Sequence, residues 1–477
     1  MSQPALVVDL DGTLIKTDIL YENANSFICS SPLRTPQLLK WLLSGKSTLK
    51  DKLSEHTEID VSTLPYNDKL ISWLRDEKSN GRTIILATAS HRSFAEQVAN
   101  YLNLFDDVLA TDKETNLRGQ NKADTLIKLY GEKGYDYVGD CSADLPVWKS
   151  ANIAHLVGQS EQLIKKIKKL STLGRVFDNQ DTPRIKTHLK AIRLHQWMKN
   201  LLIFVPLLAA HSITDLTSVL ITFLAFITFG MTASSVYLLN DLIDVEDDRH
   251  HHSKCKRPFA SGNLSLVQGW VIWPCILIAA LTLSLIFLPP AFFLSLIAYY
   301  TLTVAYSFLL KRKAIIDVIA LAMLYTMRII AGASATATMP SYWLLAFSIF
   351  IFLSLALIKR YSELKTAREV GKEKLRGRGY LQEDLEAVSA MGTASGYISV
   401  LVLALYIQDP STANMYSNTQ VLWAACPILI YWISRAWLIT HRGEMNDDPI
   451  VFAIKDKPSW VVGILFALVF ILAGVSL

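Results

Sequence analysis

The hydrophobic pattern of the chain changes near residue 200. Before that point, apolar residues form short runs separated by Lys, Asp and Glu, as is typical of a soluble domain. After it, apolar runs of roughly 20 residues recur, and a run of that length can cross a bilayer as a helix. The first of these runs is short and contains Pro206, so we expect its start earlier, near Leu194. The pattern predicts nine spans, at roughly 198–211, 218–239, 265–288, 290–309, 315–335, 342–358, 389–407, 419–437 and 459–476.

The loops between these spans differ sharply in charge. The loops that begin near Asn240, Leu310, Lys359 and Arg435 carry 4, 3, 8 and 4 basic residues, whereas the alternate loops and the C-terminal tail carry none. Because basic loops tend to remain in the cytoplasm, we expect an integral protein of the cytoplasmic (inner) membrane. Its N-terminal domain would be cytoplasmic and its C-terminus would lie on the opposite side, which needs an odd number of spans.

The N-terminal region alternates strand-like and helix-like segments, a pattern that predicts a parallel α/β sheet. Buried-strand patterns occur at Ala5–Thr13, Thr83–Ser90 and Tyr135–Asp140. Ligands of such sheets bind at the carboxyl ends of the strands, and polar residues gather there in this sequence. They are Asp9, Asp11, Thr88, Asp140 and Asp144, with Lys122 at the start of a helical segment.

This set of residues resembles the haloacid-dehalogenase superfamily of phosphohydrolases over roughly residues 4–158. The sequence contains DxDGT, a strand-end Thr, a Lys and GDxxxD in that order. The resemblance implies an α/β Rossmann-like domain with a helical cap, at about residues 14–78, that selects the substrate. A domain that keeps this fold without activity is the alternative, although every motif residue is present.

The resemblance also implies a role for each motif residue. Asp9 would be the nucleophile that forms an aspartyl-phosphate, and Asp11 would be the general acid and base. Thr88 and Lys122 would bind the phosphoryl oxygens. A carboxylate nucleophile divides phosphoryl transfer into two easier steps, and a cation and a lysine neutralise the charge of the phosphoryl group. The Mg²⁺ site would consist of Asp9, Asp11, Asp140 and Asp144.

The stretch Asn240–Asp248, which reads NDLIDVEDD, follows the second long apolar run. Asp241, Asp244 and Asp248 are spaced so that they share one face if the helix continues. Carboxylates at the end of a membrane helix are energetically unfavourable unless water or a cation solvates them. Mg²⁺ binds through one or two carboxylates together with substrate phosphates. The stretch therefore predicts phosphate chemistry at a membrane surface, and a solvated acidic turn is the alternative.

The pattern NDxxDxxxD after the second of nine helices resembles the UbiA family of intramembrane prenyltransferases. The resemblance covers roughly residues 185–477 and implies an all-α polytopic membrane domain. It also implies a cytosolic-side cavity that holds Mg²⁺ and a diphosphate. The residues of that site would be Asn240, Asp241, Asp244 and Asp248.

The sequence departs from many members of this family, which carry a second aspartate-rich motif after the sixth helix. Here the loop from Lys359 contains a single aspartate, Asp384, and no DxxxD pair. Cations at this place suit phosphate groups better than a second metal, although an ordinary positive-inside collar is the alternative. The helix end presents Lys359, Arg360, Tyr361 and Lys365.

The basic helix end in place of a second aspartate motif is similar to the pattern of one branch of the family, the polyprenyl-phosphate phosphoribosyltransferases. Ile192–Leu207, which includes Arg193, Lys199 and Asn200, also looks like that branch, as does Lys311–Ala333. The second segment places Arg328 in an apolar helix, where an unpaired cation is costly. We expect Arg328 to face a cavity and a phosphate, and a pair with Asp317 is the alternative. The residues that bind phosphate would then include Lys199 and Arg328, in addition to Lys359, Arg360, Tyr361 and Lys365.

The branch implies transfer of 5-phosphoribose from phosphoribosyl diphosphate to a polyprenyl phosphate. The N-terminal domain would then hydrolyse a phosphomonoester, such as the 5-phosphate of the product. The first alternative is a prenyltransferase that joins a prenyl diphosphate to an aromatic or quinone-precursor acceptor. The second is a membrane scaffold without catalytic activity. The two enzyme hypotheses imply membrane lipids and a polyprenyl lipid as partners, and no nucleic acid.

The length of 477 residues is consistent with more than one domain. We expect a phosphatase-like domain at 1–160, a basic linker at 161–188 and the membrane domain at 189–477. The linker could be a solvated helix or a segment attracted to anionic lipid. The five cysteines form no CxxC pair, so we expect no disulfide framework. The N-terminus has no basic region or apolar run of the kind found in secretory signals.

Overall fold

The chain folds into two compact units. One comprises Met1–Leu194 and Tyr237–Pro274, and the other comprises His195–Val236 and Cys275–Leu477. Each unit is described by itself. The computed structural model describes residues 3–111, 117–158, 160–178, 184–210, 212–251, 253–369, 378–413, 415–445 and 448–474.

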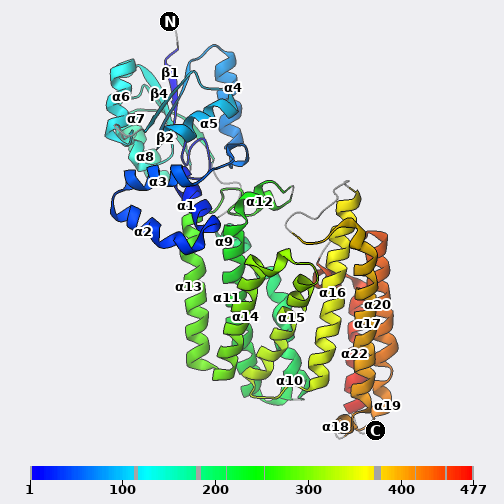
Figure 1. Cartoon of the computed structure of the whole chain (residues 1–477). Coiled ribbons are helices and arrows are strands. Elements are labelled where there is room, and N and C mark those ends of the chain that lie inside the picture. Colours follow the sequence, from blue (N-terminus) through cyan, green and yellow to red (C-terminus); the bar gives the residue numbers. More distant parts are fainter. Residues whose placement is uncertain are drawn as a thin grey trace. The chain divides into compact units, whose positions relative to one another are not determined.

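The first unit is built around a parallel sheet of six strands, in the order β3-β2-β1-β4-β5-β6 (Figure 1). Val8 at the end of β1 lies beside Leu86 of β2 and Val138 of β4. Because all three strands run in the same direction, their carboxyl ends meet at one edge of the sheet. The strands are β1 (Ala5–Val8), β2 (Ile84–His91), β3 (Asp107–Thr111), β4 (Tyr135–Gly139), β5 (Ile153–Val157) and β6 (Thr172–Phe177).

Helices cover both faces of this sheet, which confirms the predicted α/β architecture (Figure 1). The alternation of side chains along β1 sets the two faces, because Leu6 and Val8 join one apolar cluster and Val7 joins the other. The first cluster contains residues of α4 (Asp68–Ser79) and α5 (Arg92–Leu102). The second contains residues of α6 (Gln120–Tyr130), α7 (Leu145–Ser150) and α8 (Glu161–Leu170).

A group of helices between β1 and α4 forms the cap. Phe27, Leu49 and Leu53 make a small apolar core of their own, and the ring of Trp41 lies 5.2 Å from that of Phe27. The elements of the cap are α1 (Ile19–Ser30), η1 (Pro32–Arg34), α2 (Thr35–Leu43), α3 (Lys46–His56) and η2 (Val61–Thr63). The cap therefore has a small core of its own, although Ile19 of α1 and Val61 of η2 belong with the apolar cluster of the sheet.

Much of the segment expected to be a basic linker is part of the sheet domain. Leu163 and Ile167 of α8 are buried against the sheet, and β6 pairs in parallel with β5. The apolar period of α8 explains this packing, because one stripe of the helix is buried while its lysines remain on the other side. The chain continues through α9 (Arg184–Ala191).

The second part of the first unit is the segment Tyr237–Pro274. It contains the end of α11 (Leu216–Ile243), the short helix α12 (Val245–Arg249), η6 (Lys254–Lys256) and the start of α13 (Leu266–Phe287). The stretch Asn240–Asp248 thus lies where α11 ends and α12 begins. Helices α11 and α13 each contribute residues to both units.

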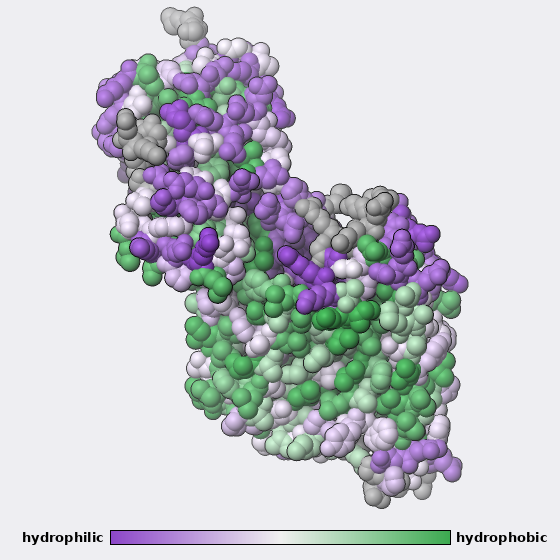
Figure 2. All heavy atoms as spheres, in the orientation of Figure 1, coloured by the Kyte–Doolittle hydropathy of each residue, from purple (hydrophilic) through white to green (hydrophobic). Residues whose placement is uncertain are grey.

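The second unit is a helical bundle, and hydrophobic side chains cover much of the face of its helices that Figure 2 shows. Its largest apolar cluster joins α15, α16, α17 and α20. Its long helices are α14 (Pro290–Phe308), α15 (Ile316–Ala335), α16 (Tyr342–Glu369), α17 (Leu385–Gln408), α20 (Ala425–Arg442) and α22 (Lys457–Gly474). Shorter elements are η5 (Ser212–Thr214), η7 (Leu310–Arg312), η8 (Gln382–Asp384), α18 (Pro410–Ala413), α19 (Thr419–Leu422) and α21 (Pro449–Lys455).

Eight helices in the described part of the chain are long and apolar enough to cross a membrane. They match the predicted spans from the second to the ninth. The segment 198–211, predicted as the first span, is instead a 3₁₀ helix, η4 (Leu194–Phe204), followed by α10 (Val205–Ala209). Pro206 explains the difference, because proline lacks an N–H and clashes with the carbonyl four residues earlier in an α-helix.

The backbone of η4 packs closely against α15. A Cβ atom added at Gly332 would lie under 3.0 Å from the backbone of Ile203. We expect Gly332→Ala to push η4 and α15 apart and to lower the free energy of unfolding by about 1–3 kcal/mol, the usual cost of overpacking. Thermal unfolding of the purified protein in detergent would measure the loss.

The matched control is Gly463→Ala in α22, where nothing lies within 4 Å of an added Cβ atom. This variant should keep or slightly raise the unfolding temperature, because alanine is the better helix former by about 1 kcal/mol. Equal unfolding temperatures for the two variants would contradict the close packing of η4.

Candidate functional sites

The first candidate site lies at the carboxyl edge of the sheet in the first unit. Asp9 directly follows β1, Thr88 lies within β2, and Asp140 directly follows β4. Lys122 is on α6, and Asp144 ends the 3₁₀ turn η3 (Ser142–Asp144). The parallel order of these strands brings residues that are far apart in the sequence to one place.

Hydrogen bonds and ion pairs join these side chains. Lys122 Nζ lies 3.0 Å from Asp9 Oδ2 and 4.0 Å from Asp144 Oδ1. Thr88 Oγ1 donates to Asp11 Oδ2 at 3.3 Å, and Ser90 Oγ donates to the same oxygen at 2.6 Å. The structure therefore brings together the residues predicted from the motifs. Sequence reasoning missed Ser90, although it lies two residues beyond the predicted strand-end Thr88.

Gly12 in the DxDGT motif is required by the shape of the turn. Its φ is +73°, and a Cβ atom added there would lie under 3.0 Å from the carboxylate of Asp140. A residue with a side chain would be strained and would displace that carboxylate. The glycine thus allows the loop after β1 to approach the loop after β4.

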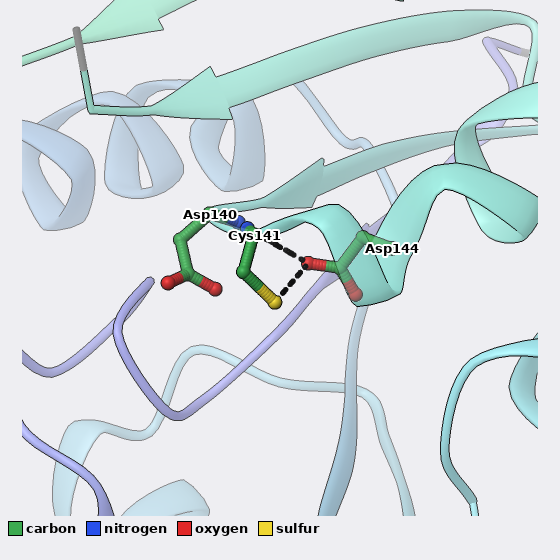
Figure 3. Close-up of side chains that lie close together, drawn as sticks. All are labelled: Asp140, Cys141 and Asp144. Atoms are coloured by element: carbon green, nitrogen blue, oxygen red, sulfur yellow. Dashed lines mark hydrogen bonds between the residues drawn. The ribbon is translucent and has the colours of Figure 1, made fainter. Parts of the chain in front are cut away.

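Asp140, Cys141 and Asp144 offer ligand atoms that lie within 4.8 Å of one another (Figure 3). Asp144 Oδ2 accepts hydrogen bonds from Asp140 N at 3.2 Å and Cys141 Sγ at 3.7 Å. Burial, with the neighbouring carboxylates, raises the pKa of Cys141 to about 12. Because only a thiolate binds metals well, the carboxylates remain as ligands, and oxygen ligands suit a hard cation such as Mg²⁺.

Negative charge in this cluster exceeds positive charge. Burial and neighbouring carboxylates raise the pKa of Asp140 to about 8 and that of Asp11 to about 7. Burial also raises the pKa of Asp9 to about 6, although Lys122 opposes the shift. A divalent cation would relieve this repulsion, so the donor set fits Mg²⁺.

The cluster lies in a cavity of about 540 Å³ in the first unit. Lys16, Tyr21 and Lys50, from the segment between β1 and α4, line it together with the motif carboxylates. A further part of the lining comes from Gly262–Gln268, before and within the first turn of α13. The cavity thus combines elements from both parts of the first unit.

The second candidate site is the stretch Asn240–Asp248. The backbone hydrogen bonds continue through the junction of α11 and α12, from Asp244 N to Asn240 O at 2.9 Å and from Asp248 N to Asp244 O at 2.8 Å. Asp241 and Asp248 are each only 2% exposed. The helical path therefore holds both carboxylates in the protein rather than in solvent.

Two arginines bind these carboxylates. Arg257 Nη1 lies 3.2 Å from Asp241 Oδ1 and 2.6 Å from Asp248 Oδ2, and Arg193 pairs with Asp241. Among the described residues, the aspartates of this stretch do not gather around one point as Asp140 and Asp144 do. Sequence reasoning assigned no role to either arginine, although both are basic residues close to the membrane boundary.

Arg193 has an unusual backbone. Its φ is 51°, in the left-handed region, and its guanidinium lies 5.2 Å from the ring centre of Tyr237. A non-glycine residue in this region costs on the order of 1 kcal/mol or more and is common at functional sites. The conformation occurs between α9 and η4 and directs the side chain to Asp241.

In the second unit, two lysines share one carboxylate. Lys199 Nζ lies 2.9 Å and Lys359 Nζ 3.5 Å from the same oxygen, Oδ2 of Asp448. Burial opposes ionisation of Asp448, but the two lysines outweigh it and hold the pKa of its carboxyl below the usual value. Two cations thus share one carboxylate, so the group carries a net positive charge.

Arg328 is 4% exposed and lies among aromatic rings. Its Nε donates to Asn200 Oδ1 at 2.9 Å, and its Nη2 donates to Tyr299 OH at 3.3 Å. The alternative pair with Asp317 is not formed, because Asp317 binds Arg360 instead. A phosphate ligand for Arg328 stays a prediction.

The remaining basic residues are divided between two other places. Arg360 is fully buried, and its Nη2 lies 2.8 Å from Asp317 Oδ2, while Nη1 pairs with Glu363. Tyr361 OH is 2.9 Å from His441 Nδ1, and Lys365 donates to the backbone oxygen of His441. The structure does not bring Arg360, Tyr361 and Lys365 into the group formed by Lys199 and Lys359.

The fold combines an α/β domain in the N-terminal part of the chain with a bundle of helices that are long and apolar enough to cross a membrane. Residues 201–455, just over half of the 477, match the model of the UbiA prenyltransferase family. The chain belongs to the UbiA prenyltransferase family and is therefore a transferase. The resemblance drawn from the aspartate motif is confirmed.

Three similar proteins illustrate the relationship. The uncharacterised protein y4nM of Sinorhizobium fredii is 36% identical over 98% of this chain and 90% of its own length. The decaprenyl-phosphate phosphoribosyltransferase of Mycobacterium tuberculosis H37Rv is 36% identical over 56% of this chain and 88% of its own length. A solved UbiA homologue from Archaeoglobus fulgidus, bound to GPP and Mg²⁺, is 18% identical with a TM-score of 0.47 and covers 61% of this chain and 100% of its own.

The raised pKa values at the first site predict a pH dependence of stability. Asp9, Asp11 and Asp140 hold protons in the folded state that the unfolded chain releases above its pKa of 3.8. Without metal, the free energy of unfolding should therefore fall as the pH rises from about 4 to about 8. Unfolding temperatures in EDTA should show this loss, and Mg²⁺ should raise the temperature more at about pH 8 than at about pH 5.

The control for this experiment is Asp140→Asn, which removes the carboxyl with the highest of the three pKa values. Its unfolding temperature should depend less on pH and respond less to Mg²⁺. A wild-type protein that Mg²⁺ stabilises equally at both pH values, or not at all, would argue against a cation at this cluster.

Proposed function

We propose that this protein transfers 5-phosphoribose from phosphoribosyl diphosphate to a polyprenyl phosphate, and that its N-terminal domain then removes the 5-phosphate. The observation that carries the transferase part is the pair of lysines on Asp448, since two cations on one carboxylate suit a phosphate better than a second metal ion. The similarity to a decaprenyl-phosphate phosphoribosyltransferase supports the same choice. The lipid would be the acceptor and the small sugar phosphate the donor.

The aspartate stretch would bind the leaving diphosphate. Asn240, Asp241, Asp244 and Asp248 would hold Mg²⁺, which would neutralise the diphosphate charge. Arg193 and Arg257 now pair with Asp241, and a cation on that carboxylate would release them to bind phosphate oxygens. Arginine suits this task because its planar group can donate two parallel hydrogen bonds.

The basic group in the second unit would bind the other phosphate. Lys199 and Lys359 would exchange Asp448 for the lipid phosphate or for the 5-phosphate of the donor. Arg328, held by Asn200, would add positive charge in the bundle interior. Such fixed cations stabilise the transferring groups without rearranging at the moment of reaction.

The N-terminal domain would act by nucleophilic catalysis. Asp9 would attack the phosphorus atom and form an acyl phosphate as the ester bond breaks, while Asp11 gives its proton to the departing hydroxyl. Asp11 would then take a proton from the water that hydrolyses the acyl phosphate. Burial and neighbouring carboxylates raise the pKa of Asp11, which suits a group that must hold a proton and donate it. Lys122 and Thr88 would hold the phosphoryl oxygens, and Mg²⁺ bound with Asp140 and Asp144 would offset their charge.

We also propose the predicted orientation, in which the basic loops and both sites face the cytoplasm. Helix α10 and the 3₁₀ helix η4 would supply the ninth crossing. At about 2.0 Å per residue in a 3₁₀ helix and about 1.5 Å in an α-helix, they extend about 30 Å, the thickness of the hydrocarbon core. The same proposal begins the membrane domain at about residue 189, with α8 and β6 assigned to the sheet domain.

A direct assay distinguishes the transferase from its alternative. Purified protein with Mg²⁺ should transfer label from phosphoribosyl diphosphate to polyprenyl phosphate. Asp241→Asn should lower this rate by about a hundredfold or more, as expected when one charged group at a transition state is lost. The control Glu246→Gln, an exposed residue of the same stretch, should remain active. Transfer only from a prenyl diphosphate to an aromatic acid would overturn the proposal.

A second assay tests whether the two activities act in sequence. Asp9→Asn should leave transfer intact and cause the 5-phosphorylated lipid to accumulate, because the nucleophile of the phosphatase is lost. Mass spectrometry of the lipid products would measure the ratio of phosphorylated to dephosphorylated product. An unchanged ratio would show that the phosphatase acts on another compound.

A further inference from the structure

One wall of the phosphatase cavity comes from outside the haloacid-dehalogenase-like sequence. Gly262, Asn263, Ser265 and Gln268 line the same cavity as Asp9. These residues precede α13 or lie in its first turn, and α13 is a candidate membrane span that begins at Leu266. All of them belong to the first unit. The cavity that holds the nucleophile is therefore bounded by the beginning of a membrane helix.

Buried contacts hold the residues on either side of this segment against the cap. Arg249 donates to both carboxylate oxygens of Glu22, at 3.0 and 2.7 Å, and both side chains are almost fully buried. Asn25 Nδ2 donates to Leu242 O, and Trp270 Nε1 donates to Asn25 Oδ1, each at 2.9 Å. A buried, bidentate pair is costly to separate, so the segment and α1 keep one arrangement.

A glycine allows the closest approach between the two parts. Gly262 has a φ of +72°, and a Cβ atom added there would lie 2.7 Å from Lys16 Cβ and 3.0 Å from Lys16 O. Lys16 also lines the cavity. The backbone of the segment is thus fitted against the loop that follows the nucleophile.

The side chains of this wall have a distinct chemistry. Asn263, Ser265 and Gln268 are neutral and can each donate and accept hydrogen bonds. Asn263 Oδ1 is buried and has no hydrogen-bond partner. An acceptor left in this state is unfavourable, and the hydroxyl group of a ligand would satisfy it. Neutral amides and hydroxyls suit the hydroxyls of a sugar, whereas Lys122 and the carboxylates serve the phosphate.

We infer that Gly262–Gln268 acts as a second cap that selects a lipid-linked sugar phosphate, with Asn263 and Gln268 as specificity-determining residues. This inference rests on the proposed phosphatase activity and identifies the residues that select its substrate. A phosphomonoester whose chain stays in the bilayer can reach a cavity that borders the start of a membrane span. A soluble sugar phosphate would make no use of that location.

The experiment compares two substrates on the full-length protein in detergent. One is a polyprenylphosphoryl ribose 5-phosphate, and the other is p-nitrophenyl phosphate, which has no sugar hydroxyl. The ratio of their kcat/KM values should fall about tenfold in Asn263→Ala, since one neutral hydrogen bond is worth about that factor. It should fall further in Asn263→Ala combined with Gln268→Ala. The control Val271→Ala, an exposed residue of α13 that does not line the cavity, should keep the wild-type ratio.

A third substrate, free ribose 5-phosphate, tests the lipid requirement. The wild type should hydrolyse it with a kcat/KM at least about tenfold below that of the lipid-linked compound, a factor equal to one good hydrogen bond or more. Equal values for the two compounds would overturn the substrate class. An unchanged ratio in both Asn263→Ala and the double variant would overturn the role of the wall. A wild type that hydrolyses none of the three compounds would instead refute the proposed phosphatase.

The buried pair offers an independent test of the arrangement. Arg249→Met leaves the buried Glu22 without its cationic partner, and it should lower both the unfolding temperature and the ratio for the lipid-linked substrate. The double variant Arg249→Met with Glu22→Leu replaces the pair by apolar groups, a change that is often neutral or stabilising. It should restore the ratio. A ratio that stays at the wild-type value in Arg249→Met would show that the segment does not contribute to selection.

Discussion

The structure depends on matching buried carboxylates with cations. Burying an unpaired charge is among the largest penalties a fold can incur, and each unit meets this constraint with specific partners. Asp9 binds Lys122, and Glu22 binds Arg249 in the first unit. Asp317 binds Arg360 in the second. These pairs join elements that are far apart in sequence, so charge matching also fixes how the elements pack.

The sites differ in how this match is made. At the edge of the sheet, the carboxylates outnumber the nearby lysine. Burial and this excess of negative charge raise the pKa values of Asp9, Asp11 and Asp140. At Asp448, two lysines share one carboxylate, and the pKa of the acid is lowered. The first arrangement favours an added cation, and the second favours an added anion. Asp241 lies between these cases, because Arg193 and Arg257 balance its charge.

Much of the first site could be predicted from sequence because its residues follow strand patterns directly. The polar residues at the ends of β1, β2 and β4 were predicted, and parallel strands bring such ends together. Strand β6 was not predicted, because it is a mostly exposed edge strand without an apolar run. The roles of Arg257 and Arg360 were also hidden. Their partners are chosen by tertiary packing, and no local pattern marks that Arg360 binds Asp317 rather than a phosphate.

The division of the first unit along the chain has a consequence for synthesis. Residues 1–194 leave the ribosome first, but the segment that completes the unit, Tyr237–Pro274, follows α11. The Asp9 cavity therefore gains its last wall only after the apolar residues of α11 have been synthesised. Residues 1–194 alone therefore do not form the whole pocket, which is completed only when the later segment has been synthesised.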